Sequence, residues 1–433
     1  MSTIVRRVVA GFGANAVGQI VQVAIQLLSF PLFLQQWDAA TYGVWLMLSA
    51  TPAYLTMADV GMVTTAGNRM TMVMARGDVV SANTIFQSAL ALVGCICVGL
   101  TLLVVPLCLW APLPGLSNVD ERVALSALSL GVLIAPFGGL TEAIFRATGR
   151  YPVAATLAAA ARLGEWGGSL LGLWLIGSFS AVAICGLAVR LIGTAAAMGW
   201  AGRRSQGLRW GLRHARRVEV RAMIGPSVSF MIFPLANALS LQGVTLLVGH
   251  FFGPALVTVF SAYRTLARVT VQSTSMLSFA VWPEFSRLFG HGSAAAVRPV
   301  YLRAELLGTG FAVAVSFVLY FIGPWLLRIW THGVIAFEPA LMGLLLTYAA
   351  VGGVGHMPRT LLMATNQHID LARWSLAGGV AVLALAFLIG SSLGLDGIGL
   401  AMLITEAGIS FVCLRLVREV LRTAPLAAQG ASG

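Results

Sequence analysis

The chain has 433 residues, of which 58% are hydrophobic and only 10% charged, and its mean hydropathy is +0.89. This composition excludes an ordinary soluble globular protein and predicts a polytopic membrane protein. The net charge of +12 comes entirely from arginine, because the sequence contains no lysine. In such a chain, an excess of basic residues indicates membrane topology and contact with lipid headgroups rather than an acidic partner.

Twelve helices are predicted, because a bilayer-spanning helix needs about 20 mostly apolar residues. The first apolar run follows Arg6 and Arg7 as a signal peptide would, but it continues to about Leu34 without a cleavage signal, so we expect a retained helix. The predicted spans of the first half are about 10–35, 43–64, 83–111, 123–147, 154–176 and 180–200. Those of the second half are about 222–250, 255–282, 300–327, 337–362, 371–393 and 397–417.

Residues 203–221, which we call the basic linker, carry seven arginines at the middle of the chain. Basic residues beside a membrane segment stay on the cytoplasmic side during insertion, so this linker is predicted to fix the topology. With both termini inside, 21 of the 27 arginines fall on cytoplasmic ends, loops or tail. We expect lobes at 1–202 and 222–422, a disordered tail at 423–433, and no nucleic-acid partner, since no soluble domain surrounds the basic linker.

The two halves resemble each other at matching loops. The turn 147–150 after the fourth predicted helix corresponds to 364–367 after the tenth, and the turn 74–78 corresponds to 289–293. The offsets are similar, 217 and 215 residues. Because six helices per half is an even number, the repeats would be parallel, as in some transporter folds.

Four amide side chains follow one another at helical spacing in the first predicted helix: Asn15, Gln19, Gln22 and Gln26. This spacing places them on one stripe. Amide side chains also form hydrogen bonds between packed helices, but four on one stripe favour the lining of a cavity. Each amide both donates and accepts, which suits sugar hydroxyls.

The eighth predicted helix carries Arg264, Arg268 and Gln272 on one face. At about 1.5 Å per residue from Pro254, Arg264 lies near the middle of a bilayer. Two guanidinium groups one turn apart repel unless an anion joins them, and their fork geometry suits phosphate. The alternative is an ion pair with an acid on another helix, and the candidate acids are Asp59, Glu165 and Glu406.

The remaining intramembrane charges are candidate coupling or gating residues. Arg162 and Glu165 are three apart and can pair, and Arg190 can join them in a buried network. Residues Gly164, Gly168 and Gly172 are expected to permit close helix packing.

Two further candidates lie near the inner ends of predicted helices. Glu142 and Arg146 are four apart and either gate an inner mouth or simply pair, and we favour pairing. Asp59 ends a polar face of the second helix and is a candidate for the lining of an inner vestibule.

Metal, cofactor and nucleophile motifs are absent from the sequence. Its six histidines are scattered singly, and no Gly-rich phosphate loop, zinc motif or nucleophile elbow appears. The five cysteines lie in or beside apolar runs, where packing is the favoured role. We therefore expect no cofactor, no metal and no enzymatic activity.

The opening of the chain, with Asn15, Pro31 and Tyr42-Gly43, resembles that of the Wzx-type polysaccharide or O-antigen flippases, and so does the turn 146–150. These belong to the multidrug, oligosaccharidyl-lipid and polysaccharide exporter superfamily. The resemblance implies two six-helix lobes around a central cavity in the bacterial inner membrane. It also implies export of an undecaprenyl-diphosphate-linked oligosaccharide by alternating access, coupled to H⁺ or Na⁺, with membrane lipid and a polysaccharide polymerase complex as partners.

Three other functions remain as alternatives. A multidrug exporter of the same superfamily would want acids and aromatics for cationic substrates, whereas this chain offers arginines. A lipid II flippase would share a positively charged cavity. A membrane polysaccharide polymerase or ligase needs a large external loop, and the longest predicted here lie near 112–122 and 324–337.

Overall fold

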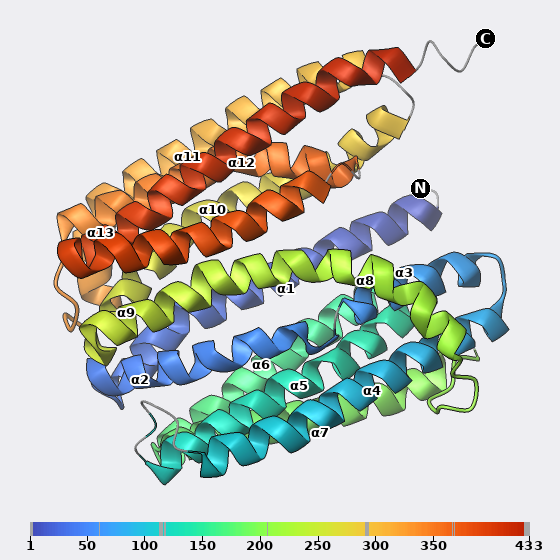
Figure 1. Ribbon diagram of the computed structural model, residues 1–433, viewed down its shortest axis with the longest axis horizontal. Helices are drawn as coiled ribbons and strands as arrows, with labels where there is room; N and C mark the ends of the chain where they lie inside the picture. Colours follow the sequence, from blue (N-terminus) through green and yellow to red (C-terminus); the bar gives the residue numbers. More distant parts are fainter. Residues whose placement is uncertain are drawn as a thin grey trace. The chain divides into compact units, whose positions relative to one another are not determined.

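The computed structural model describes residues 3–59, 61–111, 116, 118–205, 207–290, 294–365, 367 and 369–427, with backbone alone at some of them, including 3–16 and 59. Within these ranges helices are joined by short turns and loops and there is no β-strand, so the predicted all-α fold is confirmed (Figure 1).

Long helices make up the first half of the chain, and one of them is broken by a 3₁₀ segment. The helices are α1 (Thr3–Leu34), α2 (Ala39–Ala50), the 3₁₀ segment η1 (Thr51–Asp59), α3 (Met62–Ala75), α4 (Val79–Trp110), α5 (Val119–Ala147), α6 (Tyr151–Leu175) and α7 (Phe179–Arg204).

The second half has the same character, with a π-helical turn in place of the 3₁₀ segment. Its helices are α8 (Arg217–Ala238), the π turn η2 (Leu239–Gly243), α9 (Val244–Phe252), α10 (Pro254–Gly290), α11 (Ala294–Trp330), α12 (Pro339–Ala364) and α13 (Ile369–Ala427).

Each of the twelve predicted spans corresponds to one helix or one broken helix. The second span is α2, η1 and α3 together, and Gly61 at the start of α3 has a left-handed φ of 69°. The seventh is α8, η2 and α9. The last two lie within α13, where Gly394 adopts φ 65° and ψ −146° and interrupts the helix. Glycine is suited to this break because a Cβ disfavours positive φ.

Among the described residues, eight helices are long and apolar enough to cross a bilayer, and the bent pair formed by residues 39–58 and 62–74 makes a ninth. The two arms of α13 count once in that number. The chain is therefore a multi-pass membrane protein.

Two compact units make up the chain. Unit 1 comprises Met1–Asp38 and Trp45–Pro234, and unit 2 comprises Ala39–Val44 and Leu235–Gly433. The first residues of α2 belong with unit 2 because they pack on the start of α10, where the Thr258 hydroxyl donates to the Ala39 carbonyl at 2.7 Å. The lobe limits at 1–202 and 222–422 and the extent of the linker between them remain predictions.

The core of unit 1 joins α3, α4 and α5 through fully buried side chains such as Met70, Phe86 and Phe145. Leu208 of the basic linker is buried in the same cluster, and Trp210 packs against it with its ring 4.9 Å from that of Phe86. The basic linker is thus folded onto unit 1 as part of its core.

In unit 2, buried side chains of α10 and α12 pack together, among them Phe260, Met342 and Leu345. The Tyr263 hydroxyl, on α10, donates to the Ala336 carbonyl at 2.7 Å and accepts from the Glu338 amide at 2.6 Å. These bonds fix the segment that leads into α12.

Candidate functional site

A polar cavity of about 310 Å³ lies inside unit 1, between α1, α3, α5 and α6. Its polar lining is Gln19 from α1, Thr64 from α3, Glu142 and Arg146 from α5, and Arg162 from α6. These side chains come from four separate helices, so the cavity is a product of tertiary packing. Two arginines and one glutamate give the lining a net positive charge.

Small residues make the space for this cavity. Gly18, Gly139 and the α6 alanines 154, 155 and 158 line it. A Cβ added at Gly139 would come within 2.8 Å of Val63, and one at Gly67 would overlap the Arg146 guanidinium. The glycines therefore allow α3 and α5 to approach closely while leaving room for the arginine.

The two cavity arginines have no ion-pair partner within 4.0 Å among the carboxylates that the structure describes. Arg162 donates to the Gln22 side chain and to the Ala158 carbonyl, both at 3.3 Å. The Arg146 Nε is buried without a hydrogen-bond partner among the described atoms. Neither arginine forms an ion pair within 4.0 Å with a described carboxylate. Arg162 is exposed and Arg146 is partly buried, so both guanidinium groups are open to a ligand or to water.

This arrangement differs from the local pairs expected from sequence. Glu142 and Arg146 do not pair within 4.0 Å; both face the cavity instead. Glu165 pairs across the helix interface with Arg190 on α7 at 2.6 Å, and not with Arg162. The interhelical partner prevails because α6 directs Glu165 toward α7 and Arg162 toward α1.

The predicted packing role of the α6 glycines is confirmed. A Cβ at Gly168 would lie 2.7 Å from the Cys185 carbonyl, and one at Gly172 would overlap the Ala181 carbonyl. The backbones of α6 and α7 are therefore close enough to bring Glu165 and Arg190 together.

An apolar groove of about 450 Å³ adjoins the polar cavity on α5, α6 and α7. Its walls are mainly alanine and glycine, with Leu157, Val189 and Trp200. Glu142 and Ala158 line both spaces. A polar chamber and an apolar groove thus share one wall within unit 1.

In unit 2, Arg264 is held by neutral acceptors. Its guanidinium donates to the Leu241 carbonyl at 2.8 Å and to the Thr245 hydroxyl at 2.7 Å, and it lies 5.4 Å from the centre of the Phe260 ring. Leu241 belongs to the π turn η2, whose wider winding disturbs the ordinary pattern of helical hydrogen bonds. The π turn therefore supplies the carbonyl that orients this arginine.

The acids proposed as alternative partners for Arg264 and Arg268 are engaged elsewhere or outside the description. Glu406 pairs with Arg359 at 2.6 Å, between α12 and α13. Glu165 pairs with Arg190, and the side chain of Asp59 lies outside the described residues. No carboxylate among the described side chains of unit 2 lies within 4.0 Å of either α10 arginine.

The Arg359–Glu406 pair was not anticipated. Arg359 lies near the predicted inner end of the span 337–362 and is one of the 21 arginines counted as cytoplasmic. Glu406 lies in the middle of the predicted twelfth helix, and an acid at that depth needs a basic partner. The need of Glu406 for a basic partner is the feature of the sequence that could have indicated this pair.

The amide stripe of α1 is placed in part. Gln19 lines the polar cavity and Gln22 accepts from Arg162. Gln26 lies one turn further along the helix, and the Asn15 side chain lies outside the described residues. Gln272 follows Arg268 by four residues on α10 and is partly buried.

No family model matches the chain, and no curated protein matches it. Solved structures do. An inward-facing multidrug resistance MATE family transporter of the MOP superfamily is 14% identical, with a TM-score of 0.77 over 93% of this chain and 95% of that one. MATE in the bent conformation is 16% identical, with a TM-score of 0.69 over 98% and 96%.

A third similar structure is a MOP superfamily transporter from Pyrococcus furiosus, described as having a binding pocket of reverse polarity that suggests a different function. It is 14% identical, with a TM-score of 0.71 over 96% of both chains. At these identities the likeness shows the fold, which is the two-lobed MOP transporter fold. Both of these solved proteins are described as transporters.

Proposed function

We propose that this protein is a secondary transporter that moves an anionic amphiphile across the membrane. The substrate we propose is an undecaprenyl-diphosphate-linked oligosaccharide, carried from the cytoplasmic to the periplasmic leaflet of the bacterial inner membrane for O-antigen or other cell-surface polysaccharide. The observation that carries the proposal is the polar cavity of unit 1, where Arg146 and Arg162 outnumber Glu142 and form no ion pair within 4.0 Å with a described carboxylate.

The chemistry of the cavity fits the headgroup of such a lipid. A diphosphate satisfies unpaired guanidinium groups by charge-assisted hydrogen bonds. Gln19 and Gln22 can both donate to and accept from sugar hydroxyls. The adjoining apolar groove supports a substrate with a hydrocarbon portion, because most of its lining residues are alanine, glycine or larger apolar residues, with Thr141, Glu142 and Thr194 as the polar ones. Arg264 and Arg268 add a second positive face in unit 2.

The similar solved structures do not decide whether the substrate is an anion or a cation. The MOP transporter described as having a pocket of reverse polarity indicates that this fold accommodates pockets of different charge.

An energy source is part of the proposal. Glu142 is the candidate carrier of a coupling proton, because it faces the polar cavity without an ion pair within 4.0 Å among the described residues. Glu165 is less suited to that role, since Arg190 holds its charge. Na⁺ remains the other coupling ion to be tested, and a polysaccharide polymerase complex remains a proposed partner.

A multidrug exporter of cations is the second candidate function. The similar structure with the TM-score of 0.77 is a multidrug resistance transporter, and Glu142 offers one carboxylate to a cation inside the cavity. We favour the anion because the two arginines that share the cavity would repel an organic cation.

The test is transport in proteoliposomes, with a labelled lipid-linked oligosaccharide and a cationic dye as parallel substrates. Arg146→Gln and Arg162→Gln should each reduce glycolipid transport by about tenfold or more, the loss expected when a charge-assisted bond worth about 1.5–3 kcal/mol is removed. Arg373→Gln is the matched control, because Arg373 forms an exposed pair with Asp370 in unit 2 and is not one of the residues that line the cavity. Dye export without glycolipid transport would assign the protein to the multidrug function.

A further inference from the structure

The basic linker is fastened to α4 by three buried polar side chains. Gln87 donates to the Arg209 carbonyl at 3.0 Å and accepts from the His214 amide at 2.6 Å. The Asn83 side chain accepts from the Arg209 amide at 3.1 Å, and the Ser88 hydroxyl accepts from the Arg216 amide at 2.9 Å. The linker is therefore held through its backbone, and α4 supplies the bonds.

Hydrophobic anchors hold the same segment from within. Leu208 is 1% exposed, and the Trp210 indole donates to the Met198 carbonyl at 3.1 Å on α7. Trp210 also packs on Phe86. The path of the basic linker is thus fixed by buried groups that carry no charge.

The arginine side chains are not used in this attachment. All seven arginines of the basic linker are exposed: Arg203, Arg204, Arg209, Arg213, Arg216, Arg217 and Arg221. Within the described part of the chain, no ion pair or side-chain hydrogen bond joins any of these seven guanidinium groups to the protein. Their charge is available to a partner outside the chain.

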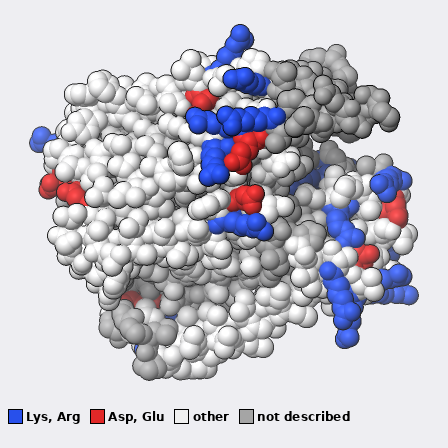
Figure 2. Space-filling view, turned by 45° about the horizontal axis from the view of Figure 1, so that its top comes forward, with Lys and Arg blue, Asp and Glu red and all other residues white. Residues whose placement is uncertain are grey.

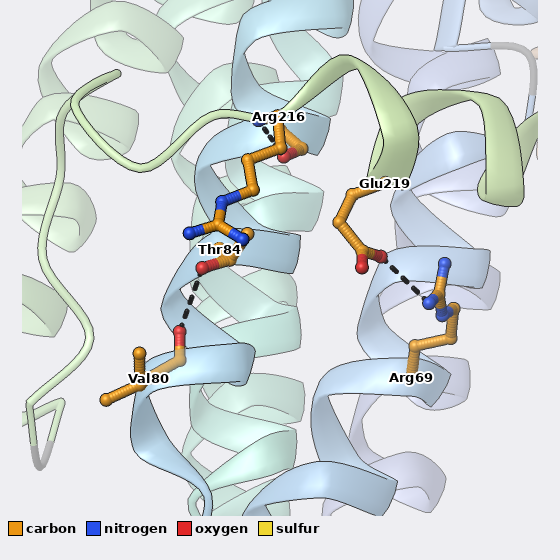
Figure 3. Close-up of polar contacts among 6 residues, drawn as sticks. Arg69, Val80, Thr84, Arg216 and Glu219 are labelled. Atoms are coloured by element: carbon orange, nitrogen blue, oxygen red, sulfur yellow. Dashed lines mark hydrogen bonds and ion pairs between the residues drawn. The ribbon is translucent and has the colours of Figure 1, made fainter.

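The one acid of the basic linker does not neutralise this charge. Glu219 is bound at 2.8 Å to Arg69 of α3, and Figure 3 shows these two side chains pointing toward each other. Figure 2 shows how unusual such charge is on this protein, since most of the visible surface carries no charged residue. The basic linker is therefore a concentrated cationic surface.

Two apolar side chains lie exposed among the arginines. Leu212 is 61% exposed and Val218 is 75% exposed. Exposed apolar side chains beside arginines are typical of segments that lie at a membrane interface, where the apolar groups enter the acyl boundary. An aromatic surface for stacking nucleic-acid bases is not offered by Trp210, which is turned into the core.

We propose that the basic linker is a binding surface for anionic phospholipid headgroups of the membrane leaflet beside it. The phosphates pair with the exposed arginines, and Leu212 and Val218 enter the interface. Because the linker backbone is clamped to α4, the arginines form a preformed site rather than a flexible tether. This proposal does not depend on which substrate the protein transports.

The experiment is native mass spectrometry of the full-length protein in detergent, with phosphatidylglycerol or phosphatidylcholine added. We expect the wild type to retain phosphatidylglycerol in preference to phosphatidylcholine. The triple variant Arg209→Gln, Arg213→Gln, Arg216→Gln should bind phosphatidylglycerol about 100-fold more weakly, since each arginine contributes about a factor of five near an anionic surface. Unchanged binding in the triple variant would overturn the proposal.

The control is the double variant Arg373→Gln, Arg415→Gln, which removes two exposed arginines that have carboxylate partners in their own helix. It should bind phosphatidylglycerol as the wild type does. If the triple variant fails to fold, a salt series on the wild type still decides, because raised salt must weaken phosphatidylglycerol binding. Equal retention of both lipids, or tighter binding of an oligonucleotide than of phosphatidylglycerol, would refute the lipid assignment.

Discussion

Replacing Gln87 with leucine should release the basic linker from α4. Gln87 is 2% exposed and makes two hydrogen bonds to the linker backbone, at 2.6 and 3.0 Å. At about 1 kcal/mol net for each bond, the loss reduces the free energy that holds the linker closed by about 2 kcal/mol. Leucine is similar in size, so the change removes the bonds with little change in packing.

Limited proteolysis measures this release directly. Trypsin cleaves after arginine, and the linker presents Arg209 and Arg213 between its attachment points. A protease needs the segment to open locally, so the cleavage rate follows the population of the open form. A loss of about 2 kcal/mol therefore raises the rate about 30-fold.

Thr84→Val is the matched control on the same helix. Its hydroxyl donates to the Val80 carbonyl of its own helix at 3.1 Å (Figure 3) and forms no hydrogen bond with a described linker atom. The control should be cleaved at the wild-type rate. Equal rates for Gln87→Leu and the wild type would show that the side-chain bonds do not hold the linker, and the argument for a preformed cationic surface would fail with them.

Three further changes test other parts of the structure. Gly67→Ala should raise the KM for transport several-fold with normal expression, since the new methyl displaces the Arg146 guanidinium, and an unchanged KM would remove that arginine from the site. Arg190→Gln should destabilise the protein by about 2 kcal/mol, between the values for exposed and buried pairs, with a smaller loss when Glu165→Gln is added, as thermal unfolding of the two variants would reveal. Hydrogen bonds from the hydroxyl and the backbone amide of Ser81, at the start of α4, hold the pKa of Asp78 below its ordinary value of 3.8. The ionised Asp78 cap therefore stabilises the fold above that pH, and this stabilisation is lost as the pH falls through the lower folded-state pKa. The midpoint of unfolding should depend less on acid pH in Asp78→Ala than in the wild type.

The positions of the helices were predictable because the bilayer imposes their length. Each of the twelve apolar runs, about 20 residues long, falls on a helix or a broken helix among the described residues. The breaks within them were harder to predict, because the 3₁₀ segment at 51–59 and the π turn at 239–243 lie inside runs that are long enough for one continuous helix. Gly394 was more accessible to prediction, since it lies in the short interval between two predicted spans.

The partners of the charged residues were not predictable from spacing alone. A separation of three residues made Arg162 and Glu165 possible partners, but the rotation of α6 sends their side chains to different helices. Spacing identifies which residues share a face and does not identify the helix that the face meets. The same limit applies to Glu406, whose partner Arg359 is 47 residues away in sequence.

The attachment of the basic linker was also outside the reach of the sequence argument, although a signal existed. Asn83, Gln87 and Ser88 form a polar patch at the start of an otherwise apolar helix. Such a patch at the end of a membrane helix has few partners other than a neighbouring loop. The seven arginines of the linker indicate its topology, but they do not indicate that Asn83, Gln87 and Ser88 hold it in place.

The π turn at 239–243 makes the anchoring of Arg264 sensitive to a change of one residue in length. A π turn holds one residue more than an α-helical turn, and the helices on either side keep their faces because the bulge absorbs the addition. Deleting one residue there would restore a regular helix with α8 and α9 in the same rotational phase, but the Leu241 carbonyl would return to the helical ladder. A single-codon deletion in this segment would thus remove the Leu241 carbonyl from Arg264 without altering any charged residue.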